Sequence, residues 1–162
     1  PMRLLATILC MFLLGLVACD EDQDGTGQEP VQAGLDAFRQ GKYDQAIEAY
    51  RQALEKQPGQ AHVHNLLGMA YRFKYNQQPD PATKELEIEA FEKAVGIEPR
   101  FVVALVNLGS SYHHQGRKTD AARVFERVLD IMPTHPEAAQ LKQMIEEAKS
   151  NDTPKGEEAG PD

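Results

Sequence analysis

The sequence predicts an all-α protein, an α-solenoid of three helix–turn–helix units followed by a C-terminal capping helix. The first observation behind this prediction is the spacing of the apolar residues. From residue 30 onward they recur at i, i+3, i+4 and i+7, which marks one face of each of several amphipathic helices. The second is the lack of strand-like alternation, and the third is a recurring set of glycines and prolines. Together they indicate short helices that stack in sequence order.

One 34-residue period accounts for the recurring glycines and prolines. Gly34, Gly68 and Gly109 lie 34 and 41 residues apart, whereas Pro58, Pro99 and Pro133 lie 41 and 34 apart. Both series follow one period if seven extra residues fall between Gly68 and Pro99, and the stretch YNQQPDP at 75–81 is the place for them. This insertion is either a tolerated loop extension or an added contact for a partner.

The N-terminal segment has the pattern of an export signal. Met2 and Arg3 form a basic start, and residues 4–16 form an apolar stretch of signal-peptide length. That stretch is shorter than the ~20 residues that a membrane span needs. The segment LVAC, which ends at Cys19, resembles the lipobox of bacterial lipoproteins. The resemblance implies a signal peptide at 1–18 and lipidation of Cys19, which would attach the mature chain to a membrane. The alternative is an ordinary secretory signal with an incidental cysteine.

Acidic residues are concentrated near the two ends of the chain. The formal net charge is −8, but residues 30–149 hold only −1 of it. Residues 19–29 contain five acids and are predicted to form an acidic tether, while residues 150–162 form an acidic tail that we expect to be disordered. A nearly neutral body lacks the basic face that nucleic-acid binding needs, so we expect no nucleic-acid partner.

The body of the chain, residues 30–149, resembles the tetratricopeptide repeat (TPR) family. The matching segments are GLDAFRQGKYDQAIEAYRQALEKQP, LGMAY with AFEKAVGIEP, and LGSSYHHQGRKTDAARVFERVLDIMP. The resemblance implies repeats at about 27–60, 61–101 and 102–135. In these, Gly34, Gly68 and Gly109 would leave room for two helices to cross closely, and the aromatic residues Tyr50, Phe91 and Phe125 would fill the wedge between them. Glu87 departs from the pattern, because the family prefers a small residue there. Asp80 and Pro81 have the sequence of a helix N-cap and first turn.

The C-terminal capping helix is predicted at 136–149. Thr134 and Glu137 have the spacing of a capping box. An apolar stripe follows at helical spacing, formed by Leu141, Met144, Ile145 and Ala148. Such a helix would cover the last repeat with one face and present its other face to water.

The sequence contains no complete catalytic constellation, so we expect a protein that is not an enzyme and that needs no cofactor. Ser110 and Ser111 lie near His113 and His114, but no orienting acid or oxyanion feature accompanies them. The histidines have no spacing that makes a ready metal-ligand pair. A site between His113 and either His62 or Asn65 on another helix stays conceivable, but no metal is expected.

The family resemblance implies that a protein or peptide partner binds in a concave groove lined by the first helix of each repeat. The positions that this implies are Leu35, Phe38, Arg39, Asn65, Met69, Arg72, Phe73, Val106, Ser110, His113 and His114. The alternative for several of them is packing against neighbouring helices. The lysine and asparagine clamp by which some family members hold acidic C-terminal tails is not reproduced here.

These observations lead to the expectation of a membrane-anchored TPR lipoprotein in a bacterial cell envelope, facing the periplasm. Such an adaptor would help assemble or localise an envelope complex, in a pilotin-like or outer-membrane assembly role. Two alternatives remain, a self-stacking structural component and an accessory regulator of a peptidoglycan enzyme. The sequence does not decide between the inner and outer membrane.

Overall fold

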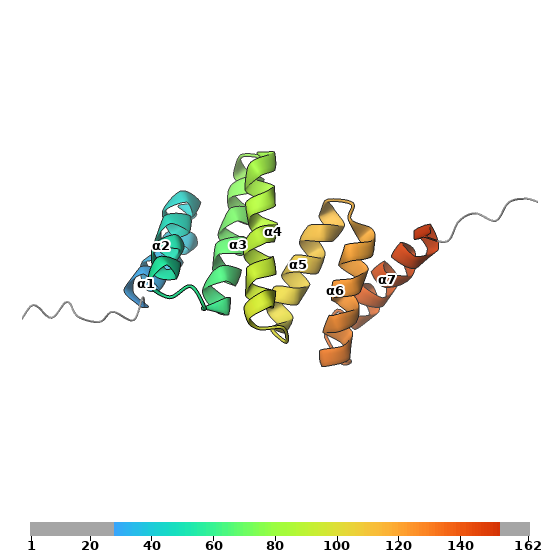
Figure 1. Cartoon of the computed structure of the whole chain (residues 1–162). Coiled ribbons are helices and arrows are strands. Elements are labelled where there is room, and N and C mark those ends of the chain that lie inside the picture. The colour runs from blue at the N-terminus through green and yellow to red at the C-terminus, as the bar shows by residue number, and fades with distance from the viewer. Residues whose placement is uncertain (1–27, 153–162) are drawn as a thin grey trace, which may run out of the picture.

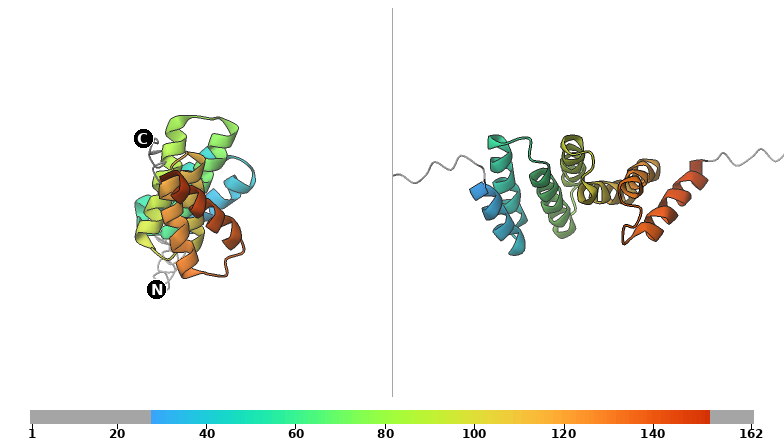
Figure 2. Two further views of the ribbon diagram at one scale, coloured as in Figure 1. Left: turned by 90° about the vertical axis from the view of Figure 1, so that its right-hand side faces the viewer. Right: turned by 90° about the horizontal axis from the view of Figure 1, so that it is seen from below.

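The computed structural model describes residues 28–152, and these form an all-α solenoid (Figure 1). The helices are α1 (Gln28–Arg39), α2 (Tyr43–Lys56), α3 (Ala61–Gln77), α4 (Pro81–Ile97), α5 (Val102–His114), α6 (Lys118–Ile131) and α7 (Ala138–Asp152). Each helix packs mainly on its neighbours in sequence. The helices follow one another along a row, with α1 and α7 at opposite ends (Figure 2). The predicted fold class is confirmed.

The ends of the described region differ from the predicted segment boundaries. Helix α1 begins at Gln28, inside the segment assigned to the tether, and Glu29 lies in its first turn, where the helix dipole favours an acid. Helix α7 continues to residue 152, beyond the predicted end at 149, and Lys149 pairs with Glu126 and Glu146 near that end.

Several predicted features lie outside the described residues. They are the signal peptide, Cys19, most of the tether and most of the tail. Within residues 28–152, the structure has no helix with both the length and the apolar character to cross a membrane.

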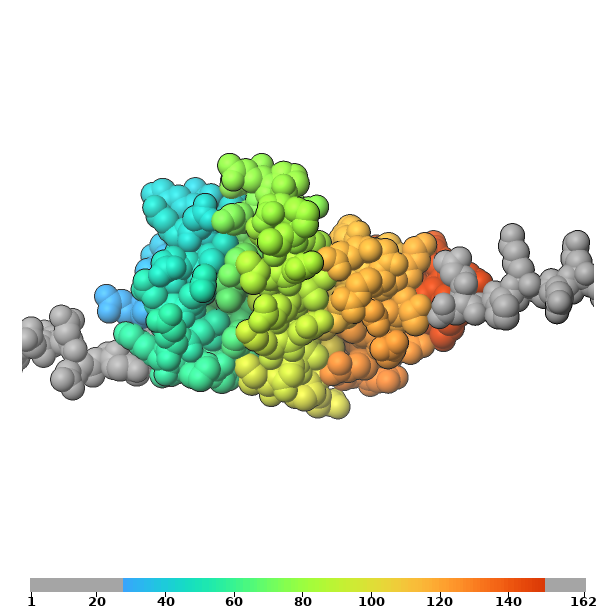
Figure 3. Space-filling model, turned by 45° about the horizontal axis from the view of Figure 1, so that its top comes forward, coloured from blue at the N-terminus to red at the C-terminus, as the bar shows by residue number. Residues whose placement is uncertain are grey.

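The seven extra residues of the second repeat lengthen its helices and leave its turn short. Helices α3 and α4 have 17 residues each, whereas α5 and α6 have 13 and 14. The turn at 78–80 is as long as the turn at 115–117. The α3–α4 hairpin therefore stands above its neighbours (Figure 3). A loop extension, one of the two alternatives for this segment, is not what the structure shows.

The N-cap predicted at the start of α4 is present. Asp80 accepts hydrogen bonds from the Thr83 backbone nitrogen at 3.0 Å and from its hydroxyl at 2.9 Å. These bonds favour the carboxylate form, so they lower the pKa of Asp80. Pro81 occupies the first turn, where its missing N–H costs nothing.

Each repeat is held by the backbone of its first helix lying directly against an aromatic ring of its second. A Cβ added to the glycine would lie 2.4, 2.6 and 2.4 Å from the nearest ring carbon in repeats one to three. The pairs are Gly34 with Tyr50, Gly68 with Phe91, and Gly109 with Phe125. Any side chain at the glycine would push the two helices apart, so the glycine spacing found in the sequence is the spacing of these contacts.

The apolar core has two parts that meet at the second repeat. One part joins α1 and α2 to α3, and the larger part joins α4 to α5, α6 and α7. Helix α4 contributes to both, since Ala90 packs into the first part and Phe91 into the second. The two parts therefore adjoin at α4, within the second repeat.

The capping helix covers the last repeat, but it begins differently from the prediction. Leu141, Ile145 and Ala148 are buried as the stripe predicted. The helix begins at Ala138, and the His135 ring nitrogen Nδ1 accepts the Glu137 N–H at 3.2 Å. The predicted capping box of Thr134 and Glu137 is wrong, because the proline at 136 disfavours the helical conformation at His135 and delays the helix.

Tyr50 is expected to weaken the first repeat through its hydroxyl. Its Oη atom is buried and has no hydrogen-bond partner within residues 28–152, whereas Phe91 and Phe125 occupy the equivalent positions without a polar atom. Tyr50→Phe should raise the free energy of unfolding, measured in urea at pH 7, by about 1 kcal/mol, since an unsatisfied buried hydroxyl is removed. Tyr112→Phe, which removes a hydroxyl that bonds to Glu92, should lower it by a similar amount.

The same variant should change the alkaline stability of the protein. Burial raises the pKa of Tyr50 to about 12, although the nearby Arg39 charge lowers it somewhat. A raised pKa means that the folded state holds the proton more tightly than the unfolded state. The resulting stability is present below pH ~10 and is lost as the pH rises toward 12. Tyr50→Phe should lose less stability over this range than the wild type, and an equal loss in both would contradict the assignment.

Candidate functional site

Three aromatic side chains join the first two repeats. They lie near the α1–α2 turn and near the C-terminal end of α3. We call Phe38, Tyr43 and Phe73 the aromatic cluster. Phe38 lies with its ring centroid 5.2 Å from that of Phe73 and 5.4 Å from that of Tyr43, both edge-to-face. The Tyr43 and Phe73 centroids are 5.5 Å apart. Phe73 is 39% exposed, so the cluster presents apolar surface to solvent.

The turn between α1 and α2 brings Tyr43 beside Phe38. Gly41 has φ +71°, a conformation that glycine adopts without strain, and its N–H donates to the Phe38 carbonyl at 3.0 Å. On the other side, Lys74 pairs with Asp44 and ties α3 to α2 next to the cluster. Phe38 and Phe73 were predicted to line a partner groove. Tyr43 was missed because it lies on a second helix, and the prediction considered only first helices.

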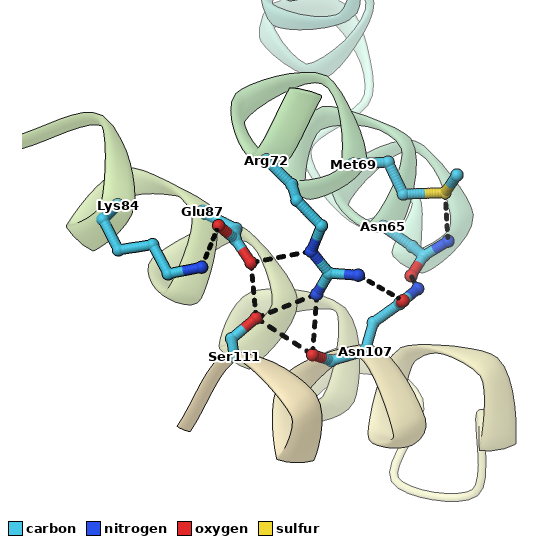
Figure 4. A network of polar contacts seen from close by, with 7 residues as sticks. All are labelled: Asn65, Met69, Arg72, Lys84, Glu87, Asn107 and Ser111. Atoms are coloured by element: carbon cyan, nitrogen blue, oxygen red, sulfur yellow. Dashed lines mark hydrogen bonds and ion pairs between the residues drawn. The ribbon is translucent and has the colours of Figure 1, made fainter. Parts of the chain in front are cut away.

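Three predicted groove residues, Asn65, Met69 and Arg72, meet other polar side chains at the joint between the second and third repeats (Figure 4). We call this set the Arg72 network. Arg72 donates from Nε to Glu87 Oε1 at 2.9 Å and from Nη1 to Asn107 Oδ1 at 3.0 Å. Its Nη2 donates to the Asn107 carbonyl and to Ser111 Oγ, both at 2.9 Å. The remaining members are Asn65, Met69 and Lys84.

Glu87 is the buried anion at the centre of this network. Its side chain is fully buried, and it receives hydrogen bonds from Arg72, from Ser111 and from Lys84 Nζ at 2.8 Å. Two cations and a hydroxyl thus compensate the desolvation of one carboxylate. The helix register at Glu87 is the regular one, since Phe91, one turn further along α4, packs on Gly68 as in the other repeats. The departure from the family pattern is therefore a substitution that the neighbouring helix accommodates.

The Arg72 network pairs Asn65 and Arg72, two of the polar side chains that the sequence assigned to partner binding, with other residues of the protein. Asn107 Nδ2 donates to Asn65 Oδ1 at 3.0 Å, and Asn65 Nδ2 lies 3.9 Å from the Met69 sulfur. The Arg72 side chain is 24% exposed, and its guanidinium also lies 4.9 Å from the Phe91 ring centre. The structure therefore brings Asn65, Met69 and Arg72 together, but as a joint that fixes α3 against α5.

The other predicted groove residues are more loosely placed. Leu35, Val106, Ser110 and His113 are half-buried, whereas Arg39 and His114 are exposed. Arg39 pairs with Asp36 on its own helix. The hydroxyl of Ser111 bonds to Glu87, and the rings of His113 and His114 pack edge-to-face with centroids 6.2 Å apart. In the part of the chain that the structure describes, no group of three or more His, Cys, Asp or Glu side chains could hold a metal ion.

Removing Arg72 should destabilise the solenoid. Arg72→Met leaves Glu87 buried with less compensation, so the free energy of unfolding in urea should fall by about 2–4 kcal/mol. The double variant Arg72→Met/Glu87→Leu removes both charges and should regain most of this loss. As a matched control, Arg39→Met breaks an ion pair whose side chains are 68% and 53% exposed, and it should cost less than about 0.5 kcal/mol. Equal losses in Arg72→Met and Arg39→Met would show that the network adds nothing.

Comparisons with known proteins agree with the repeat architecture. A family model described as TPR repeat matches residues 34–72, and a model described as tetratricopeptide repeat matches residues 102–135. Neither model covers α4, which carries Glu87 and part of the seven-residue extension. Sequence relatives include human Protein IFIT1 homolog B, 28% identical, with the match covering 82% of this chain and 34% of that protein. Another is the chloroplastic tetratricopeptide repeat domain-containing protein PYG7 of Arabidopsis thaliana, 29% identical over 76% of this chain and 40% of that protein. The chain thus spans well under half the length of these curated relatives.

Solved structures show the same fold. The first TPR domain of Spaghetti (RPAP3), bound to the HSP90 peptide SRMEEVD, superposes with a TM-score of 0.65 at 22% identity, covering 77% of this chain and 96% of that one. The TPR2B domain of yeast Sti1 in its complex with an Hsp70 peptide gives a TM-score of 0.62 at 16% identity, covering 78% and 98%. With the glycine–aromatic contacts and the stacked helix pairs, these matches show that residues 34–72 and 102–135 contain tetratricopeptide repeats and that the described chain has the fold of a TPR solenoid.

Proposed function

We propose that this protein is a non-enzymatic adaptor that binds a protein partner on the surface of its first helices. The single observation that carries the proposal is the aromatic cluster, in which Phe73 is 39% exposed although it packs against Phe38 and Tyr43. Exposed aromatic residues that are already held in place are typical anchors of interfaces. Peptide complexes of structurally similar TPR domains support the same class of function.

The rigidity of the surface supports this function. The Lys74–Asp44 ion pair and the aromatic contacts tie α3 to the first repeat, while the Arg72 network ties it to the third. A surface that is fixed before binding loses little conformational entropy when a partner docks. The aromatic cluster offers ring faces and edges but little charge, so the partner segment that fits it carries an apolar or aromatic side chain.

We further propose that the chain is a lipoprotein attached to a bacterial envelope membrane through Cys19 and facing the periplasm. What supports this is the sequence of the N-terminal segment, in which a basic start, an apolar stretch and LVAC precede the acidic tether. Anchored there, the adaptor would help assemble or localise an envelope complex, in a pilotin-like or outer-membrane assembly role.

The partner surface is tested by cross-linking the full-length protein in native membranes. Phe38→Ala/Phe73→Ala should reduce recovery of a specific partner roughly ten-fold or more, since loss of an interface anchor costs about 1–2 kcal/mol or more. Ile97→Ala, which removes an exposed apolar side chain on α4, is the matched control and should leave recovery unchanged. Recovery of only this protein, equally from all forms, would instead support self-stacking.

The anchor is tested separately. Wild-type protein should fractionate with membranes and carry the mass of an acylated Cys19, whereas Cys19→Ala should lose both properties. If Cys19→Ala stays in the membrane fraction with an unchanged mass increment, lipidation is excluded. Because the aromatic cluster lies on the folded repeats, this result would not affect the proposed partner surface.

A further inference from the structure

Two grooves on the solenoid are related by the repeat itself. Groove 1, about 400 Å³, lies between α2 and α4 with α3 behind them. Groove 2, about 470 Å³, lies between α4 and α6 with α5 behind them. Their lining residues occupy equivalent repeat positions. The equivalent pairs used below are Arg51 with Glu92, Tyr71 with Tyr112, Leu67 with Leu108, Glu55 with Gly96, and Leu86 with Asp120.

Groove 2 satisfies its own polar groups. The Tyr112 hydroxyl donates to a carboxylate oxygen of Glu92, and the Arg117 guanidinium lies 4.1 Å from the centre of the Tyr112 ring. Arg117 in turn pairs with Asp120 at 2.8 Å. Burial, followed by the bond to Glu92, raises the pKa of Tyr112 to about 12. A buried tyrosine at this position is therefore completed by a carboxylate from the preceding second helix.

Groove 1 has the same tyrosine but lacks that carboxylate. Tyr71 is 7% exposed, and its hydroxyl makes no hydrogen bond to any other residue between 28 and 152. Arg51 stands where groove 2 has Glu92, and it forms no ion pair within the same described residues. Burial raises the pKa of Tyr71, and among the nearby charges Arg51 lowers it whereas Glu89 raises it. Tyr71 and Arg51 both line groove 1.

Most other residues of groove 1 are apolar or paired, but Glu55 forms no ion pair, and the buried His64 Nδ1 has no hydrogen-bond partner, within residues 28–152. Leu86 is 41% exposed at the position of Asp120, and it faces the groove together with the buried Leu67. Lys93 is paired with Glu89 at 2.7 Å, so this cation and this anion offset each other. Glu55 lies one turn further along α2, at the position of Gly96, and not at the position equivalent to Glu92.

We propose that groove 1 is a second docking site, which binds a partner segment carrying a carboxylate next to an apolar side chain. The carboxylate accepts hydrogen bonds from the Tyr71 hydroxyl and the Arg51 guanidinium, and so plays the role toward Tyr71 that the Glu92 carboxylate plays toward Tyr112 in groove 2. The apolar side chain covers Leu86 and Leu67. A tyrosine hydroxyl and an unpaired guanidinium together favour a carboxylate over an amide, because both donate and one is charged.

This site is distinct from the aromatic cluster. On α3, Leu67 and Tyr71 line groove 1, whereas Phe73 of the aromatic cluster lies two residues beyond Tyr71 and so projects from a different face of the helix. A partner bound at groove 1 would contact α2 and α4, the second helices of two repeats. Failure of either proposed surface would therefore leave the other intact.

The test uses isotope-labelled full-length protein titrated with the peptide acetyl-Leu-Glu-Leu-amide, with acetyl-Leu-Gln-Leu-amide as the matched probe. We expect the acidic peptide to shift the NMR signals of Tyr71 and Leu86, with an affinity roughly ten-fold higher than that of the glutamine peptide. Arg51→Gln should abolish the preference for the acid. Leu86→Ala should weaken both peptides alike, since it removes apolar surface only.

Arg51→Glu is the most discriminating variant, because it places a carboxylate in groove 1 at the position that Glu92 has in groove 2. The new carboxylate should bond to Tyr71, raise the pKa of that tyrosine in an alkaline titration, and abolish binding of the acidic peptide while the protein stays folded. The proposal is overturned if the peptide does not bind, if the glutamine peptide binds equally well, or if the shifts map to Phe38 and Phe73. It is also overturned if the Tyr71 and Leu86 signals respond to Glu157→Gln/Glu158→Gln, because the occupant would then be the tail of this chain.

Discussion

The direct contact between a helix backbone and an aromatic ring is the constraint on which the rest of this structure depends. In each repeat a glycine leaves room for the ring of Tyr50, Phe91 or Phe125, and every one of these rings is almost fully buried. Because no side chain intervenes, the two helices of a repeat cross at close range. The pair leaves one apolar surface exposed, and the next pair of helices packs on that surface. Repetition of this contact three times gives the stack, and α7 ends it by covering the last apolar edge with Leu141, Ile145 and Ala148.

Stacking alone would leave the joints between repeats similar to one another, yet they differ in chemistry. The first joint is aromatic and ionic, with Phe73 against Phe38 and Lys74 paired with Asp44. The second joint is a buried polar network around Glu87. Buried charges are costly, so such a network is best understood as a device that fixes one arrangement of neighbouring helices. The network therefore holds α3 in place on the face turned toward α5, while other faces of α3 contribute Phe73 to the aromatic cluster and Tyr71 to groove 1.

The extension of the second repeat preserves this arrangement because it is shared between two antiparallel helices. Helix α3 is four residues longer than α5, and α4 is three residues longer than α6, so each grows by about one turn while the connecting turn keeps its length. The Gly68–Phe91 contact and the register of α4 therefore stay unchanged. The same periodicity makes groove 1 and groove 2 comparable position by position, and the comparison exposes Tyr71 and Arg51 as groups without the carboxylate that completes groove 2.

The sequence by itself determined the all-α class, the three repeats, the glycines and aromatic residues of the helix crossings, and the cap at Asp80, because each depends on local spacing or on a period that recurs along the chain. It also predicted Phe38 and Phe73 as groove residues from their positions on first helices, and the structure places both in the aromatic cluster. Only the tertiary structure decided that Arg72 would turn toward Glu87 and Asn107, that Tyr43 would join the aromatic cluster, and that the extra residues would lengthen helices. These outcomes depend on contacts between residues 15 to 35 positions apart for Arg72, and on which rotamers the crossing helices allow. Periodicity tells which face of a helix a residue occupies, but the neighbouring helix decides what that face meets.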